Sequence, residues 1–381
     1  TLSHRMGEGR GEGAVCCIPR IASHPRVVAR VDMKQRWHLF ARLMGMVASC
    51  ALLGAGALPT RAAVLAFPEP VQRSLEQEDW SGFLNALAGD PLTNSTLRLV
   101  VVRALFETGR LPEEQFSWIH RSGPELLSTS ELRQYAGAAH LAETLLQLGC
   151  LNAAERLAFD SLEMEGENPS ALRTLARLHL VRGLTNAAGI FLNRLDAYPE
   201  HRSWVDRFRA GLAGDASAMP DPTIARIREN LLRGDRIAAG LTTERLLQLA
   251  RESNPRNAMA FEYLLAHQLL QRRLLFAVRT LAKSSPGQDG PLPRHYAEAV
   301  VLHRSLYPGI SVASLLARVP PAVLASFQDF HQMMGRAAGE LERVRPEAWR
   351  DFGNTYWYYY FFGLPEPTSL SPGPETPGTH E

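Results

Sequence analysis

The chain has 381 residues, of which 45% are apolar and 21% charged, so it is long and apolar enough to bury a sizeable core. Residues 1–66 carry nine Lys/Arg and three Asp/Glu, whereas the remainder carries 32 Lys/Arg and 36 Asp/Glu. Residues 67–381 therefore have a net charge of −4, which does not attract the phosphate backbone of a nucleic acid, so no nucleic-acid partner is predicted.

Residues 1–32 are interpreted as a non-native extension upstream of the protein. Thr1 cannot initiate translation, and Met33 stands directly before a basic segment, where a start is expected. The extension contains the adjacent cysteines Cys16 and Cys17. Without a second pair of cysteines, they predict neither a metal site nor a disulfide framework.

Residues 33–66 resemble an export signal. Lys34, Arg36 and Arg42 precede an uncharged, mostly apolar run over 43–58, and small residues suited to cleavage follow. Such a run covers roughly 24 Å of a ~30 Å hydrocarbon core, which favours a cleaved signal peptide over a retained membrane anchor. Either outcome places the protein in the bacterial cell envelope, free in the periplasm or held at the membrane.

A further alternative is lipidation of Cys50, because Val47-Ala48-Ser49-Cys50 resembles a bacterial lipobox. In a lipoprotein that cysteine is acylated and becomes the mature N-terminus. The residues after Cys50 stay apolar instead of forming a polar tether, so an ordinary cysteine of the signal region is the competing interpretation. Cys150, the one cysteine of the body, falls in a predicted turn between helices and is expected to be a small, partly buried residue.

From about residue 68 to residue 360 the apolar residues have helical spacing. Leu141, Leu145 and Leu148 illustrate the recurrence at three and four residues, and alternating strand-like runs are nearly absent. The sequence therefore predicts an all-α fold.

A repeat of 34 residues relates two segments of the body. Residues 149–154 (Gly-Cys-Leu-Asn-Ala-Ala) align with residues 183–188 (Gly-Leu-Thr-Asn-Ala-Ala) at that offset. This is the tetratricopeptide period, with small residues where two helices cross and glycine in the turn between them. Residues 135–168 and 169–202 are thus predicted to be tetratricopeptide-like helix pairs that stack into a solenoid.

More degenerate helix pairs flank these two units. One covers residues 105–116, and another covers 258–281, where Arg272 and Arg273 stand in place of the turn glycine. The predicted organisation is N-terminal helical repeats over 67–210, a hinge loop rich in Gly and Pro over 211–222, C-terminal helical repeats with an aromatic cap over 223–363, and a disordered tail over 364–381.

Three stretches are more distinctive than generic repeats: residues 257–266, residues 292–299 and the closing run over 352–362. They resemble the C-terminal repeat region of an uncharacterised family of bacterial envelope proteins, a domain of unknown function, over about residues 70–363. Larger members of that family place a multi-span membrane region before the helical part. The resemblance implies a fold and a compartment, and it carries over no catalytic residue.

One polar cluster is the strongest candidate for chemistry. His295 and Glu298 are three residues apart, hence on one side of a helix, and a second helix that carries Glu262 can approach them. His267 and His303 lie in the same two helices. The order is the reverse of the usual Glu-x-x-His of helical metal sites and there is no second copy, so a buried hydrogen-bonded cluster is favoured over a metal site. No metal, cofactor or catalytic residue is predicted.

Two other features are candidate binding surfaces, an aromatic run near the C-terminus and a groove in the repeats. The aromatic run over 356–362 is either a membrane-interface belt, a docking patch or, as we favour, a cap that wedges its rings between helices. In tetratricopeptide units the first helix of each pair lines a groove, and candidate groove residues are Glu143, Gln147, Arg173 and Arg177. The two arginines, four residues apart, are placed to clamp a carboxylate of a partner peptide, and a solvated basic face is the alternative.

These observations predict an exported helical-repeat scaffold or adaptor that binds a protein or peptide partner at the bacterial cell envelope. We do not expect an enzyme. The alternatives are an envelope enzyme or accessory subunit with a site near Glu262, His295 and Glu298, and a structural lipoprotein.

Overall fold

The computed structural model describes residues 67–88, 95–119, 137–213, 222–232, 241–283, 290–337 and 340–363. The chain divides into two units, Thr1–Thr60 and Arg61–Glu381, and every described residue belongs to the second. The upstream extension, the leader with Cys50, most of the hinge loop and the tail lie outside the described residues.

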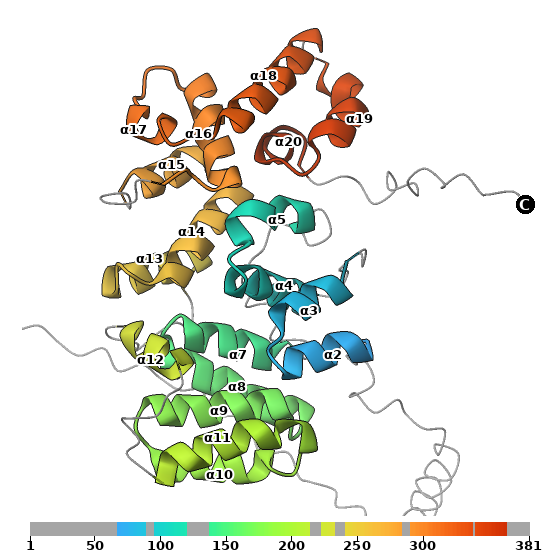
Figure 1. The fold of residues 1–381 in the computed structure, drawn as a ribbon. Coiled ribbons are helices and arrows are strands. Elements are labelled where there is room, and N and C mark those ends of the chain that lie inside the picture. Colours follow the sequence, from blue (N-terminus) through green and yellow to red (C-terminus); the bar gives the residue numbers. More distant parts are fainter. Residues whose placement is uncertain are drawn as a thin grey trace, which may run out of the picture. The chain divides into compact units, whose positions relative to one another are not determined.

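The described part of the chain is all-α, as predicted, and contains no strand (Figure 1). The first helices are α2 (Glu69–Glu76), α3 (Trp80–Ala86), α4 (Ser95–Glu107), α5 (Leu111–Ile119), α7 (Ala138–Gln147), α8 (Leu151–Glu165), α9 (Pro169–Val181), α10 (Thr185–Leu195), the short 3-10 helix η2 (Pro199–His201) and α11 (Arg202–Ala213). The later helices are α12 (Pro222–Glu229), α13 (Thr243–Ser253), α14 (Ala258–Leu270), α15 (Leu274–Lys283), α16 (Arg294–Leu306), α17 (Ala313–Leu316), α18 (Pro321–Arg336), α19 (Leu341–Phe352) and α20 (Tyr356–Phe362).

The two 34-residue units form the helix pairs α7–α8 and α9–α10, and their turns share one geometry. Gly149 and Gly183 have φ of +91° and +74°, a left-handed conformation that glycine adopts without a Cβ penalty. The amide of the residue after each glycine donates to the carbonyl five residues earlier, Cys150 to Leu145 at 2.9 Å and Leu184 to His179 at 2.8 Å.

The same turn closes a more degenerate pair. The amide of Arg273 donates to the carbonyl of Gln268 at 2.8 Å between α14 and α15. Arg272 occupies the left-handed position there, with φ +54°, where the two tetratricopeptide-like units have glycine. The hydrogen bond and left-handed conformation of the turn are therefore kept where glycine is absent, and the arginine there has a strained backbone.

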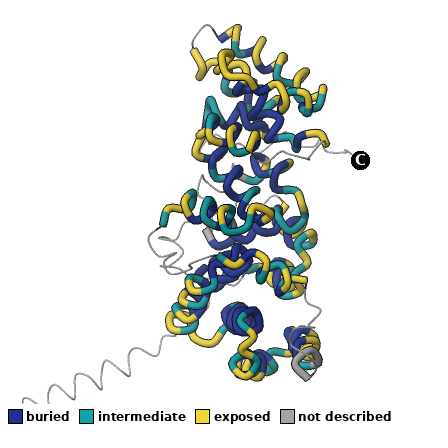
Figure 2. The backbone as a smooth tube through the Cα atoms, turned by 90° about the vertical axis from the view of Figure 1, so that its left-hand side faces the viewer, coloured by how far each residue is buried: buried dark blue, intermediate teal, exposed yellow. Residues whose placement is uncertain are grey.

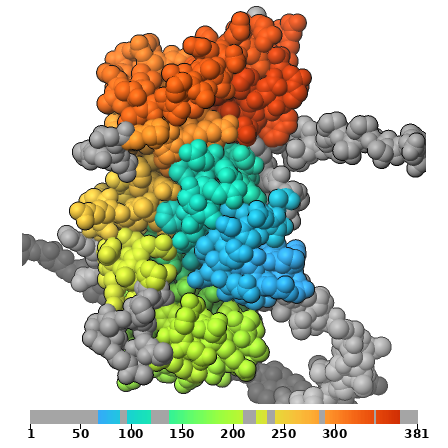
Figure 3. Space-filling view, in the orientation of Figure 1, coloured from blue at the N-terminus to red at the C-terminus, as the bar shows by residue number. Residues whose placement is uncertain are grey.

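The helix pairs do not simply stack in chain order. Consecutive helices pack in pairs, as in α7–α8, α9–α10 and α13–α14, but α12 returns onto α7 and α9, while α5 packs against α14 and α16. Figure 3 shows the N-terminal helices pressed against the C-terminal ones within this unit. The solenoid expected from the repeat thus stays a prediction, while the pairing of its helices is observed.

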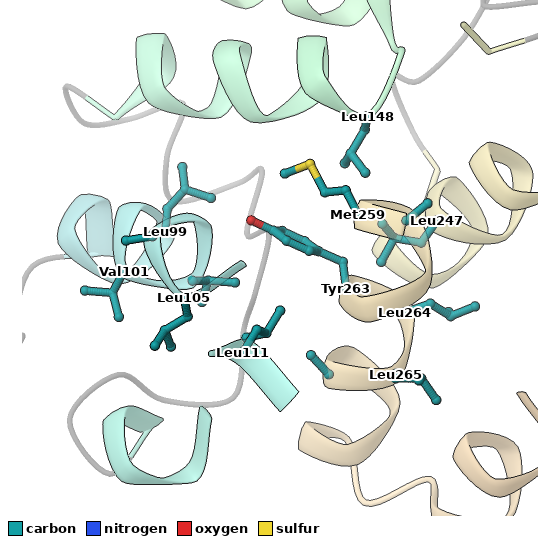
Figure 4. Close-up of a cluster of buried hydrophobic side chains, with 14 of the residues drawn as sticks. Leu99, Val101, Leu105, Leu111, Leu148, Leu247, Met259, Tyr263, Leu264 and Leu265 are labelled. Atoms are coloured by element: carbon teal, nitrogen blue, oxygen red, sulfur yellow. The ribbon is translucent and has the colours of Figure 1, made fainter. Parts of the chain in front are cut away.

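One buried apolar cluster extends through the described helices. Tyr263 projects from α14 toward Leu99 and Leu105 of α4, and Met259 lies near Leu148 at the end of α7 (Figure 4). Buried residues lie where helices face one another and exposed residues on the outward faces (Figure 2). None of the described helices has both the length and the apolar character needed to cross a membrane.

Candidate functional site

The four predicted groove residues are brought together between α7 and α9. Arg177 Nη1 donates to Glu143 Oε1 at 2.8 Å, and Gln147 Nε2 donates to the same oxygen at 3.0 Å. The other oxygen of Glu143 accepts from Thr174 Oγ1 at 2.9 Å. All four groove residues are buried, and Arg177 is only 1% exposed. The first helices of the two repeats therefore meet through a closed polar contact.

The carboxylate that the two arginines clamp belongs to this chain. Arg177 Nη2 donates to Glu78 Oε1 at 2.8 Å, and Arg173 Nη1 lies 3.8 Å from that oxygen. Arg173 Nη1 also donates to the carbonyl oxygen of Glu76 at 3.1 Å. Glu78 stands in the turn between α2 and α3 with φ +55°, a conformation that is uncommon for glutamate.

Further groups from α4 and α12 complete the cluster. Arg103 Nη2 donates to Glu143 Oε1 at 3.4 Å. Arg226 on α12 donates to both oxygens of Glu107, at 3.1 and 3.2 Å, and to Gln147 Oε1 at 2.9 Å. The guanidinium of Arg177 also lies 5.3 Å from the ring centroid of Trp204. The inner face of the repeats is thus covered by the chain's own helices.

Four members of the cluster were not predicted from the sequence: Glu78, Arg103, Glu107 and Arg226. Each meets at least one partner across 40 or more residues of chain, for example 99 between Glu78 and Arg177. Spacing along a single sequence carries no signal for such pairs. One pair did have a signal, because Glu143 and Arg177 are separated by the repeat period of 34 and so occupy equivalent positions of adjacent first helices.

The electrostatics of this cluster favour fully charged side chains. Burial by itself raises the pKa of Glu143, but Arg177, Arg103 and Arg173 outweigh it and hold the pKa well below its ordinary value. Burial likewise raises the pKa of Glu78, yet the same three arginines lower it to about 2. Removing one member leaves a buried charge uncompensated, so the cluster fixes how α2, α4, α7, α9 and α12 pack.

The second candidate cluster, on α16, is a helix anchor. His295 Nδ1 lies 2.8 Å from Glu298 Oε2, which also accepts from the backbone amide of Tyr356 at 2.8 Å. Glu298 Oε1 accepts from Arg294 Nε at 2.9 Å. Both carboxylate oxygens are therefore occupied, and one of them binds the first amide of α20, where a negative charge is stabilising.

Glu262 does not join that pair in the described part of the chain. Its Oε2 is buried without a hydrogen-bond partner among the described residues, and burial raises its pKa to about 7. His267 lies on the same helix, and His303 is buried on α16, where burial lowers its pKa. Within the described residues, no three His, Cys, Asp or Glu side chains are arranged to hold a metal ion.

The remaining sequence candidates lie in the core. Cys150 is fully buried at the start of α8. The aromatic run forms α20, in which residues 356–359 are buried. Its Tyr359 hydroxyl donates to the carbonyl of Leu270 at 2.7 Å, and the rings of Tyr356 and Tyr359 lie within 5.3 Å of the Phe116 ring on α5. The run thus ties the C-terminal helices to α5 and α14.

An exposed apolar face on the second helices of the repeats was not anticipated from the sequence. Phe159 on α8 is 46% exposed and Ile190 on α10 is 63% exposed. The rings of Phe159 and Phe191 lie 6.2 Å apart and bridge the two helices. Leu184, half exposed, is the N-cap residue directly before α10. We call these four residues the outer face.

Comparison with known proteins identifies one family. Residues 70–363 match DUF6057, which is described as a family of unknown function. No curated protein and no solved structure matches the chain.

Proposed function

The chain belongs to the DUF6057 family, whose function is unknown, and from that premise we propose that it is an exported scaffold or adaptor which binds a partner protein at the bacterial envelope. The observation that carries the proposal is the outer face, Phe159, Leu184, Ile190 and Phe191, on the second helices of the two repeats. Exposed apolar side chains that adjoin one another typically mark interaction sites.

The inner face of the repeats, formed by α7 and α9, is covered by the chain's own helices, which supports a binding site on the outer face. A partner carboxylate could reach Arg173 and Arg177 only by displacing Glu78, together with α2 and α3. That segment buries Phe83 and Leu84 almost completely. Burial of each such side chain contributes about 1.5–3 kcal/mol, so exchange with a peptide at the inner face is strongly disfavoured.

The charges around the outer face indicate the chemistry of the partner. Several are paired with one another: Arg156 with Asp160 at 3.8 Å, Arg182 with Glu155 at 2.7 Å, and Arg194 with Glu167 at 3.4 Å. Glu163, four residues after Phe159, is exposed as well, so the surround is slightly acidic. Such a surround with exposed aromatic and aliphatic side chains suits the apolar stripe of an amphipathic helix in a protein partner. It does not favour an anionic surface or a nucleic acid.

Photocrosslinking at Ile190 in living cells, followed by reconstitution with the purified crosslinked protein, tests this function. We expect Phe159→Ser to weaken the reconstituted complex by roughly tenfold or more, because burial of a phenylalanine side chain contributes about 1.5–3 kcal/mol. Leu324→Ser, which removes an exposed leucine from α18, serves as the control and should leave the affinity unchanged. No adduct at Ile190, or equal losses in both variants, refutes the proposal.

The location is a separate part of the proposal and rests on the leader over 33–66. Intact mass of the protein, started at Met33 and recovered from periplasmic and membrane fractions, tests it. A mature chain that begins near Ala63 or Phe67, or at an acylated Cys50, supports export. An unprocessed chain in the cytoplasmic fraction contradicts it.

A further inference from the structure

A second surface, formed by α15 and the end of α16, has a different character from the outer face. Phe276 on α15 is 50% exposed, and Leu306 at the end of α16 and Tyr307 and Ile310 in the turn that follows are exposed as well. Every residue from 304 to 311 is exposed, so this turn projects from its helix. We call the surface of Arg272, Phe276, Arg279, Lys283, Arg304, Leu306, Tyr307 and Ile310 the basic aromatic face.

The parts of this face are neighbours in the structure. Phe276, Arg279 and Lys283 lie on α15 three and four residues apart, hence on one side of it, and Arg272 stands in the turn just before that helix. Arg279 acts electrostatically on His303, whose ring lies 5.2 Å from that of Tyr307. The Arg272 guanidinium lies 5.4 Å from the ring centroid of Tyr359 on α20. Helix α16 packs against both α15 and α20, so the parts of the face adjoin one another.

The charge of the face is uniform. Residues 271–283, 304–318 and 356–363 contain six Lys/Arg and no Asp or Glu. Of these cations, Arg273 is paired with Glu244 from α13, and Arg304 donates to the carbonyl of Pro308 at 2.8 Å, which holds the projecting turn. Arg279 and Lys283 are exposed. This local excess of positive charge contrasts with the net negative charge of the body as a whole.

We propose that the basic aromatic face binds the surface of an anionic phospholipid membrane. Arg279, Lys283 and Arg304 would meet lipid phosphates, and Phe276, Leu306, Tyr307 and Ile310 would enter the interfacial region. Aromatic rings and long cationic side chains are the groups that favour that region. The inference is independent of the outer face and of the leader.

Hydrogen exchange of the full chain, with and without vesicles, tests the proposal at the face itself. The leader can also hold the chain at a vesicle, so the readout is local: slower exchange in peptides that cover residues 304–311 and 272–283. We expect slowing with phosphatidylglycerol vesicles and none with phosphatidylcholine vesicles. High salt should abolish it, because exposed charges are screened.

Two variants with equal charge change make the test specific. Arg279→Ala with Lys283→Ala should lower the vesicle affinity of this face by about fivefold for each cation, hence roughly 25-fold. Arg156→Ala with Arg194→Ala, on α8 and α10, removes two exposed cations elsewhere and should leave the slowing intact. Slowing that is unchanged in the first pair, or that is absent with both vesicle types, overturns the proposal. Slowing by soluble polyglutamate without slowing by vesicles overturns it in favour of an acidic protein partner.

Discussion

Replacing Gly149 by alanine should destabilise the protein far more than the same change at Gly183, the equivalent position 34 residues later. Both glycines have positive φ, so a side chain at either is strained. A Cβ on Gly183 would meet nothing within 4 Å, but a Cβ on Gly149 would lie 1.8 Å from the backbone oxygen of Asn230. The two substitutions thus share the conformational cost and differ in the clash.

The size of the difference follows from what must move. Backbone strain alone costs about 1–2 kcal/mol, which is the whole effect expected for Gly183→Ala. At Gly149 the backbone of Asn230 must also retreat by more than 1 Å to reach an allowed contact. That movement breaks the bond from the Leu232 amide to the Gly149 oxygen (3.0 Å) and the bond from Asn230 Nδ2 to the Gln147 oxygen (3.3 Å). With about 1 kcal/mol for each bond and the loss of α12 packing, Gly149→Ala should cost about 3–5 kcal/mol.

Urea unfolding followed by far-UV circular dichroism measures both variants, and hydrogen exchange of residues 222–232 reports α12 directly. We expect faster exchange in α12 for Gly149→Ala only. Asn230→Ala should not rescue that variant, because the clash is with a backbone atom. If Gly149→Ala and Gly183→Ala have the same unfolding free energy, the close approach of α12 to the first repeat is refuted.

Two pH-dependent predictions follow from the buried carboxylates, both measured by chemical denaturation at several pH values. The pKa of Glu78 is lowered to about 2, so the stabilisation that its charge provides is present above pH ~4.5 and is lost as the pH falls. Glu78→Gln should lower the unfolding free energy by about 2 kcal/mol at pH 7. If this difference from the wild type does not shrink by more than half at pH 3, the charge cluster is contradicted. The pKa of Glu262 is raised to about 7 by burial, so its ionisation destabilises the fold as the pH rises. The unfolding free energy of Glu262→Gln should therefore increase by about 2 kcal/mol relative to that of the wild type between pH 5 and pH 8. Unfolding free energies that change with pH in parallel would show that this carboxylate is not buried without a partner.

Local features of this protein could be predicted from its sequence because they depend on short-range spacing. The helical period of the leucines and the 34-residue offset between Gly149 and Gly183 predict helix pairs with glycine in the turn between the helices, and the structure contains them. The same offset relates Glu143 to Arg177, which form a hydrogen-bonded ion pair. Each of these inferences requires only that adjacent repeats adopt one geometry.

The character of each candidate site was decided by tertiary structure alone. The sequence placed Arg173 and Arg177 in an open groove, whereas α2, α4 and α12 cover them and Glu78 supplies the carboxylate. It grouped Glu262 with His295 and Glu298, whereas Glu298 is occupied by His295, Arg294 and the amide of Tyr356. These partners lie up to 99 residues apart, and a periodic pattern fixes which residues share a helix face without fixing what covers that face.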